Sequence, residues 1–325
     1  MQKLRRAWKV TRWILLLLLP LALVFFLAIV PWLVATISTT NRFHFPDKND
    51  NKTPRDFGMP YEEVEFLSTD GLHLKGWWMP ASSEPTGETP TAAAGTIIYC
   101  HGQNRTRVEM LPMAELGHEL GYNGLAFDFR HQGASEGKLS SVGYWERRDA
   151  DGAVRYALDN QHAARPVVLW GVSLGAAASL MSAAETPQVA AVISDSTFLS
   201  FEDTARHHWG LFFRRWPSFP MFDETMALIR WKAHFKASDF DLRVAVERIN
   251  PRPILFIGVE GDPRMPPDIA RTLYGLSNSP DKMLLIVPGT RHGEGFTSGH
   301  DQYVQAVTEF LGKLRADSAK VTQPR

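Results

Sequence analysis

The sequence predicts an α/β protein in which a mostly parallel, eight-stranded sheet carries helices on both faces. From residue 61 onward, eight short apolar runs alternate with longer stretches of helical character. The later runs are apolar at consecutive positions, which is typical of strands that are covered on both faces of a parallel sheet. A long charge-free segment precedes this region and predicts an N-terminal transmembrane helix.

The composition is that of a folded protein and excludes several classes. Of 325 residues, 44% are apolar and 22% are charged, which rules out wholesale disorder. Cys100 is the only cysteine, so an internal disulfide and a cysteine-based zinc site are excluded. The 35 basic and 35 acidic residues balance, and the first twelve residues hold five of the basic ones. The mildly acidic remainder argues against a nucleic-acid surface.

The N-terminal segment predicts a membrane anchor. No charged residue occurs between Arg12 and Arg42, and we place the transmembrane signal anchor at residues 13–37. This run is longer than the roughly 7–15 apolar residues of a cleaved signal, so a retained anchor is favoured over cleavage near Ala35. Trp8, Trp13 and Trp32 lie near its ends, as interfacial aromatic residues do.

The flanks of this segment predict its orientation. Residues 1–12 are basic, which favours a cytoplasmic N-terminus and places the rest of the chain on the periplasmic or extracellular side. Residues 38–56 are polar and contain prolines, so we expect a linker that leads away from the membrane.

The predicted strands and helices follow one another through residues 57–316, the α/β domain. Thr69, Asp70 and Gly71 join the first two strands in a predicted hairpin, and residues 81–95 form a surface loop. We expect a disordered tail at 317–325. The predicted strands are 61–68, 72–80, 96–100, 124–129, 167–171, 189–194, 253–258 and 283–288. The predicted helices are 107–120, 145–160, 174–185, 267–276 and 300–315.

The segment Gly171-Val172-Ser173-Leu174-Gly175 carries the strongest chemical signal. It follows an apolar strand and runs directly into an alanine-rich helix, which is the context that a G-x-S-x-G nucleophile turn requires. The glycines remove side chains that would clash at a sharp turn, and the helix N-terminus favours an anionic intermediate. The alternative is a glycine-flanked helix start with a capping serine.

A serine nucleophile requires a base and an orienting acid. In strand–turn–helix hydrolases the acid comes next along the chain and the histidine last. Asp262 follows the strand at 253–258 and His292 follows the strand at 283–288, so both lie outside the carboxyl ends of strands. By position we favour Asp262 over Glu260 and His292 over His300.

An acyl-transfer site also needs donors for the oxyanion. We expect the backbone N–H groups of Leu174, directly after the serine, and of Gln103, in the loop after the third strand. Gly102 lets that loop approach closely. His101 is interpreted as a structural residue of the loop, and Cys100 as an inert end of a buried strand.

These motifs, taken together, resemble the α/β-hydrolase superfamily of serine hydrolases, and within it the membrane-anchored, single-domain group described as serine-aminopeptidase-like or prolyl-oligopeptidase-like. The resemblance covers residues from about 57 to 312 and implies an enzyme without metal or organic cofactor. His131 stands where the family usually has glycine, and Gln103 replaces a commoner asparagine. The segments that carry it are HGQN (101–104), DFRHQGASEG (128–137), GVSLGAAAS (171–179), GVEGDPRMP (258–266) and PGTRHGEGF (288–296).

Residues 198–250 form an insertion where this family usually carries a lid. Eleven aromatic residues lie between positions 198 and 240, interleaved with basic ones. Two interpretations stay open. The segment is either a helical cap that walls an acyl pocket and touches the membrane surface, or a pair of helices packed on the sheet by their aromatic faces.

We therefore predict a membrane-anchored serine hydrolase of carboxylic esters, with small-molecule esters, lipid esters and acyl thioesters as candidate substrates. A peptidase of the same fold is the alternative, and it would need acids such as Glu136, Glu202 or Asp203 to hold a substrate amine. A non-catalytic binding protein is the third possibility. An intact serine, acid and histidine in the expected order argues against it.

Overall fold

The structure is a computed structural model that describes residues 2–40, 43–81, 93–215 and 218–322. Eight strands form one sheet in the order β1-β2-β4-β3-β5-β6-β7-β8. The β1–β2 hairpin and the β2–β4 pair are antiparallel, and the other pairs are parallel, so the predicted mostly parallel sheet is confirmed. The strands are β1 (Glu62–Leu67), β2 (His73–Met79), β3 (Thr96–Cys100), β4 (Asn123–Phe127), β5 (Val167–Val172), β6 (Val189–Asp195), β7 (Ile254–Val259) and β8 (Met283–Val287).

Helices cover both faces of the sheet because the strand side chains alternate between two apolar clusters. In β5, Val167 and Leu169 belong to one cluster, whereas Val168, Trp170 and Val172 belong to the other. On the first face lie α4 (Glu146–Asp159), α5 (Leu174–Glu185), α8 (Leu242–Ile249) and α9 (Asp268–Leu276). On the second lie α3 (Leu111–Glu119) and α11 (His300–Thr322).

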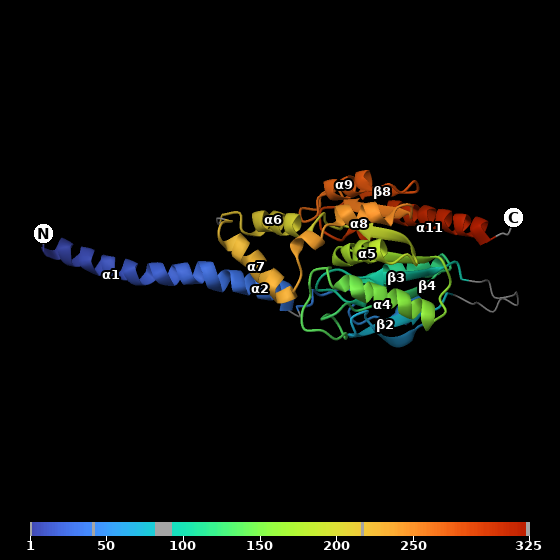
Figure 1. Cartoon of the computed structure of the whole chain (residues 1–325), viewed down its shortest axis with the longest axis horizontal. Helices are drawn as coiled ribbons and strands as arrows, with labels where there is room; N and C mark the ends of the chain where they lie inside the picture. Colours follow the sequence, from blue (N-terminus) through green and yellow to red (C-terminus); the bar gives the residue numbers. More distant parts are fainter. Residues whose placement is uncertain (1, 41–42, 82–92, 216–217, 323–325) are drawn as a thin grey trace.

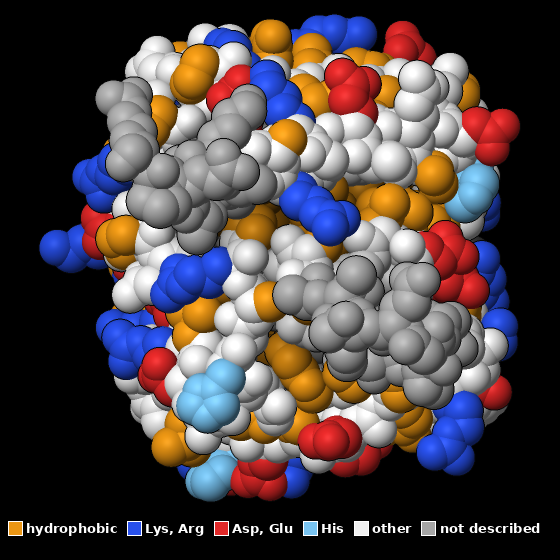
Figure 2. All heavy atoms as spheres, turned by 90° about the vertical axis from the view of Figure 1, so that its right-hand side faces the viewer, with side chains coloured by type: hydrophobic (Ala, Val, Ile, Leu, Met, Phe, Trp, Pro, Cys, Tyr) orange, Lys and Arg blue, Asp and Glu red, His pale blue; other side chains and the backbone are white. Residues whose placement is uncertain are grey.

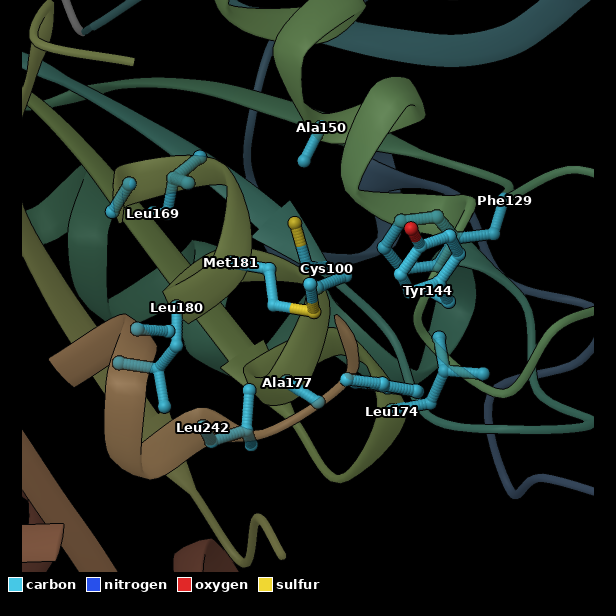
Figure 3. Close-up of a cluster of buried hydrophobic side chains, with 14 of the residues drawn as sticks. Cys100, Phe129, Tyr144, Ala150, Leu169, Leu174, Ala177, Leu180, Met181 and Leu242 are labelled. Atoms are coloured by element: carbon cyan, nitrogen blue, oxygen red, sulfur yellow. The ribbon is translucent and has the colours of Figure 1, made fainter. Parts of the chain in front are cut away.

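The first cluster reaches the start of α5, where the site lies. Figure 3 shows Ala150 of α4, Met181 of α5 and Leu242 of α8 gathered around Cys100 and Leu169 of the sheet. All five are buried. Burial raises the pKa of the Cys100 thiol to about 12, which agrees with an inert cysteine.

The N-terminal helix projects from the domain (Figure 1). It consists of α1 (Gln2–Val24), a π-helical turn η1 (Phe25–Ile29) and α2 (Val30–Thr40). By length and composition, Thr11–Thr40 could cross a membrane. The helix continues beyond the predicted end at residue 37, because Ala35 and Thr39 are buried against the rest of the protein.

Two predicted boundaries differ in the structure. The linker predicted for 38–56 begins as helix through Thr40 and ends in a 3₁₀ turn, η2 (Pro54–Phe57). The disorder predicted from residue 317 is wrong for 317–322, where α11 continues. Residues 323–325, and most of the surface loop predicted for 81–95, lie outside the described residues.

The insertion between β6 and β7 contains α6 (Phe201–Phe212), α7 (Met221–Ala233), η4 (Ala237–Asp239) and α8. The helices α6 and α7 form a hairpin beside α2, whereas α8 packs on α5 (Figure 1). Most described aromatic side chains of the insertion are buried, and Phe235 stacks on Tyr144 of the domain. Where the hairpin adjoins the domain, its aromatic side chains therefore pack into the apolar core, as the second of the two interpretations expects. Phe212, Phe219 and Trp231 are exposed.

The helix predicted at 107–120 is divided into a 3₁₀ turn, η3 (Arg107–Met110), and α3. The turn begins where the backbone N–H of Arg107 donates to Asp128 Oδ1, 2.8 Å away. This contact with the loop after β4 fixes how the chain after β3 enters its helix. The loop between β3 and η3, which contains Gly102 and Gln103, reaches the candidate site.

Candidate active site

Ser173 sits on a sharp turn between β5 and α5. Its φ of +55° and ψ of −113° are rarely adopted by a serine, and such strain is typical of a nucleophile turn. The flanking glycines are required by close approach. A Cβ atom on Gly171 would lie 2.3 Å from the Gly175 carbonyl carbon, and one on Gly175 would lie 2.0 Å from the Cys100 oxygen. Only glycines at both positions let the turn close.

The structure brings Ser173, His292 and Asp262 together. The Ser173 Oγ lies 2.8 Å from His292 Nε2, and His292 Nδ1 lies 2.7 Å from Asp262 Oδ2. The three come from the loops after β5, β7 and β8, which end at one edge of the sheet. The hydroxyl can therefore donate to Nε2 while the opposite N–H donates to the carboxylate.

Asp262 is held as an ionised acceptor. Its other oxygen, Oδ1, accepts hydrogen bonds from the backbone N–H groups of Arg264 at 2.8 Å and Met265 at 3.0 Å. Burial alone would raise the pKa of Asp262, but hydrogen bonding and charge from His292, with the two N–H groups, hold the pKa below its usual value. A carboxylate in this state fixes the orientation of the imidazole.

The rival residues lie elsewhere. Glu260 is exposed, and its backbone N–H donates to the Val287 oxygen, 2.9 Å away. His300 is the first residue of α11, and its Nδ1 lies 3.2 Å from the carbonyl oxygen of Phe296, so its side chain makes a local contact at the helix N-terminus. Of these four residues, the structure places Asp262 and His292 in the hydrogen-bonded series with Ser173.

The two predicted oxyanion donors flank the serine. Leu174 is the first residue of α5, and Gly102, next to Gln103, lies so close that a Cβ atom on it would be 3.7 Å from the Ser173 Cβ. Among the described residues, no hydrogen bond uses the N–H of Gln103 or of Leu174, so both can serve a ligand. The Gln103 side chain accepts a hydrogen bond from Ser140 Oγ at 3.1 Å, which ties the loop to the domain.

His101 is a structural residue of the same loop. Its Nε2 accepts a hydrogen bond from the backbone N–H of Phe129 at 3.0 Å, so Nδ1 carries the proton and donates to the Gly102 oxygen at 2.8 Å. The ring is fully buried, and burial lowers the pKa of His101. A neutral imidazole thus ties the loop after β3 to the loop after β4.

His131, at the position where the resemblance led us to expect glycine, has a left-handed backbone conformation. Its φ is +63°, in the left-handed region, which histidine enters more readily than most residues. Its backbone N–H donates to the Glu136 oxygen at 2.7 Å, which closes the loop. Nearby, Arg130 forms a buried ion pair with Asp149, at 2.6 Å, and this pair anchors the segment.

Glu109 was not singled out by the sequence, yet it contacts the oxyanion loop. Its Oε2 accepts a hydrogen bond from the Gly102 N–H at 2.6 Å, and its Oε1 lies 3.4 Å from Arg105 Nε. Burial raises the pKa of Glu109 to about 7, against the lowering effect of the Gly102 N–H. Nothing in the local pattern marks this residue, since it lies within a predicted helix.

Asp195, at the end of β6, is a second group that sequence reasoning missed. Its backbone oxygen accepts from the Ser173 N–H at 2.8 Å, and its carboxylate accepts from Tyr303 OH at 2.9 Å and Ser196 Oγ at 2.8 Å. Burial raises the pKa of Asp195 to about 6. The backbone oxygen of Asp195 thus holds the turn at Ser173 by a hydrogen bond, and Tyr303 of α11 fixes the position of the Asp195 carboxylate.

We expect Glu109→Gln to flatten the pH dependence of stability. A carboxyl group whose pKa is raised on folding stabilises the protein below its unfolded pKa, and the stability is lost as pH rises through the folded pKa. For Glu109 the window runs from 4.5 to about 7. The side chain is 17% exposed, and solvent screening reduces the effect. Between these pH values we expect the free energy of unfolding of the wild type to fall by up to about 2 kcal/mol more than that of the variant.

Thermal or urea unfolding at pH 5 and pH 8 measures this difference. Glu119→Gln, an exposed glutamate on the neighbouring helix, is the matched control and should follow the wild type. If the free energy of unfolding changes equally between pH 5 and pH 8 in the wild type and in Glu109→Gln, burial does not destabilise the ionised form of this carboxyl group.

In the described part of the chain, no cluster of three or more His, Cys, Asp or Glu side chains is arranged to hold a metal ion. The groups that the structure brings together at Ser173 are a hydroxyl, an imidazole and a carboxylate, and the predicted donors Gln103 and Leu174 lie on the two adjoining segments. This set can activate an alcohol for attack on a carbonyl and stabilise the resulting oxyanion.

Comparison with known proteins agrees with an α/β-hydrolase fold. The Hydrolase_4 family, described as "Serine aminopeptidase, S33", matches residues 91–252. The chain is 27% identical to YfhR of Escherichia coli K12, over 90% of this chain and 93% of that protein. It is 24% identical to the Saccharomyces cerevisiae "uncharacterized membrane protein" YNL320W, over 86% and 93% of the two. The Pyrococcus furiosus esterase Pf2001 superposes with a TM-score of 0.67 at 23% identity, over 84% of this chain and 99% of that one.

Proposed function

The chain belongs to the α/β-hydrolase superfamily, and from this premise we propose that it is a membrane-anchored serine hydrolase that cleaves carboxylic esters. The observation that carries the proposal is the unbroken hydrogen-bonded series from Ser173 Oγ through His292 to Asp262. A binding protein that had only kept the fold would have no physical need for this series. We assign Ser173 as nucleophile, His292 as general base and acid, and Asp262 as the orienting acid.

The reaction follows from these positions. His292 Nε2 takes the Ser173 proton as Oγ attacks the ester carbonyl, and the Asp262 carboxylate stabilises the imidazolium that forms. The N–H groups of Gln103 and Leu174 hold the negative charge that develops on the carbonyl oxygen. The imidazolium then gives its proton to the leaving alcohol, which leaves an acyl group on Ser173. Water, activated by His292, hydrolyses this acyl-enzyme.

The membrane part of the proposal is supported by the projecting helix. Thr11–Thr40 is long and apolar enough to cross a bilayer, and a relative of similar length is named as a membrane protein. The basic N-terminus then lies in the cytoplasm, and the catalytic domain lies on the periplasmic or extracellular side. A catalytic domain held at a bilayer surface favours esters with a hydrophobic acyl chain.

A peptidase is the second candidate, since the matching family is described by that activity. The acids that could hold a substrate amine have other partners in the structure. Glu202 pairs with Arg206 at 3.3 Å and Asp203 with Arg243 at 3.1 Å. Glu136 accepts a hydrogen bond from the backbone N–H of His73 at 3.0 Å. These contacts favour the esterase.

A substrate screen on the full-length protein in detergent micelles tests the proposal. We expect hydrolysis of p-nitrophenyl esters at a kcat/KM at least 100-fold above that of aminoacyl p-nitroanilides. Each methylene that the pocket buries is worth about 0.8 kcal/mol, so kcat/KM should rise up to about fourfold per carbon from acetate toward octanoate. Faster cleavage of the anilides would favour the peptidase, and a flat response to chain length would contradict a hydrophobic acyl site.

A further inference from the structure

The α6–α7 hairpin carries a concentration of large, exposed apolar side chains. From Lys48 on, seven such side chains are exposed among the described residues. Four lie in this hairpin: Leu211 (41% exposed), Phe212 (67%), Phe219 (76%) and Trp231 (64%). We call these four residues the hairpin patch. The other three, Leu67, Val244 and Leu284, belong to separate elements.

The hairpin lies directly beside the N-terminal helix. Helix α7 packs on α2 and on the π-helical turn at Phe25–Ile29. Val30 and Ala35 of the N-terminal helix share a buried apolar cluster with Ile229 of α7. The two helices α6 and α7 lie on the side of the domain from which the N-terminal helix projects (Figure 1). Trp231 of the patch therefore adjoins the helix that we propose to span the membrane.

Aromatic and basic residues mark the depth of this contact. The rings of Trp32 and Trp231 lie 6.4 Å apart, and the Lys232 ammonium lies 4.2 Å above the Trp32 ring. Tryptophan and lysine in such positions are typical of the membrane interface. Arg214 and Arg215 are exposed beside Phe212 and suit anionic headgroups.

Charge on the hairpin also limits its depth. Asp223 is exposed in the first turn of α7, and a carboxylate is costly in hydrocarbon. The patch thus fits the boundary between headgroups and acyl chains, about 5–10 Å deep, as amphipathic helices do. On the face turned away from the N-terminal helix, hydrophobic side chains are interspersed with side chains of both charges (Figure 2).

Helix α6 connects the patch to the candidate site. The His207 ring nitrogen Nε2 lies 2.8 Å from the carbonyl oxygen of Pro263, the residue after Asp262. One residue further, His208 packs edge-on against Phe212 of the patch, with ring centroids 5.8 Å apart. Helix α6 thus contacts the loop of Asp262 and carries two residues of the patch, Leu211 and Phe212.

We propose that the hairpin patch inserts into the lipid leaflet that faces the catalytic domain and admits bilayer-resident acyl esters to Ser173. This inference rests on the ester hydrolysis and on the anchor proposed above. It names the bilayer as the partner of the patch and a lipid ester as the substrate class. Soluble esters would reach the same serine without the patch.

Insertion is tested on the full chain in vesicles of phosphatidylcholine and phosphatidylglycerol. The native Cys100 is buried, so an environment-sensitive dye can be attached to Phe219→Cys, with Val244→Cys as the matched control. We expect a blue shift and at least twofold quenching by spin-labelled lipid for Phe219→Cys only. Equal, weak quenching at both positions would overturn the insertion.

Delivery is tested by the ratio of two rates, one on a lipid ester within the vesicles and one on p-nitrophenyl acetate. Phe212→Ser with Phe219→Ser should lower this ratio about tenfold, because two phenyl groups that we propose to insert into the bilayer are lost. Val244→Ser with Leu284→Ser should leave the ratio unchanged. An unchanged ratio in the patch variant would overturn delivery.

The two proposals fail in different ways. If the wild type cleaves p-nitrophenyl acetate but the dye at residue 219 is not quenched, the inference is overturned and the proposed hydrolase stands. If the dye is quenched but neither ester is cleaved, the proposed function is wrong and the substrate part of the inference fails with it.

Discussion

Replacing Ser173 by alanine is expected to lower ester hydrolysis by about 10⁵- to 10⁶-fold, because the variant has no nucleophile. The imidazole of His292 then has no alcohol to deprotonate, and an acyl-enzyme cannot form. Residual turnover would come from the oxyanion donors at Gln103 and Leu174, which still stabilise attack by water. The rate on p-nitrophenyl butyrate and covalent labelling by a fluorophosphonate probe both measure the loss.

Ser238→Ala serves as the matched control, since Ser238 is an exposed serine on η4 of the insertion. Its rate and its labelling should equal those of the wild type. Near-native thermal unfolding of Ser173→Ala would show that the fold is kept, because the hydroxyl is replaced by a smaller group. Persistent labelling of Ser173→Ala would place the nucleophile at another residue, and absence of labelling in the wild type would favour a non-catalytic protein.

The sheet and the nucleophile turn could be predicted because their signals are local. Apolar runs such as 167–171 indicate strands wherever they occur, and the glycines at 171 and 175 mark a turn that nothing else explains. Asp262 and His292 could be proposed as well. Parallel strands end at one edge of a sheet, so residues that follow different strands become neighbours.

Other features depend on contacts that leave no local pattern. Glu109 lies on a helix turn, and only the fold places its carboxylate at the Gly102 N–H. Asp195 and Tyr303 are 108 residues apart in sequence, and their hydrogen bond forms only because α11 packs on the sheet at the end of β6. The N-terminal helix extends past residue 37 because α7 packs beside it, and the sequence of neither segment specifies the other.

The second large effect is expected for Asp262→Asn, with a loss in kcat of about 10³- to 10⁴-fold. The asparagine oxygen can still accept from the N–H groups of Arg264 and Met265, which turns the amide NH₂ toward His292 Nδ1. An NH₂ group can donate but cannot accept, so the imidazole proton moves to Nε2. That nitrogen then cannot take the proton of Ser173.

This outcome separates orientation from folding. Glu260→Gln, the exposed rival two residues away, is the control and should stay within about twofold of the wild type, since surface changes rarely matter. Asp262→Asn should lose some stability at neutral pH, because the depressed pKa of Asp262 means that its carboxylate stabilises the fold above its usual pKa. The kinetic loss must appear at temperatures where circular dichroism shows the variant fully folded. If the loss in kcat of Asp262→Asn is smaller than that of Glu260→Gln, the orienting acid is Glu260, and the hydrogen bond between Asp262 and His292 does not contribute to catalysis.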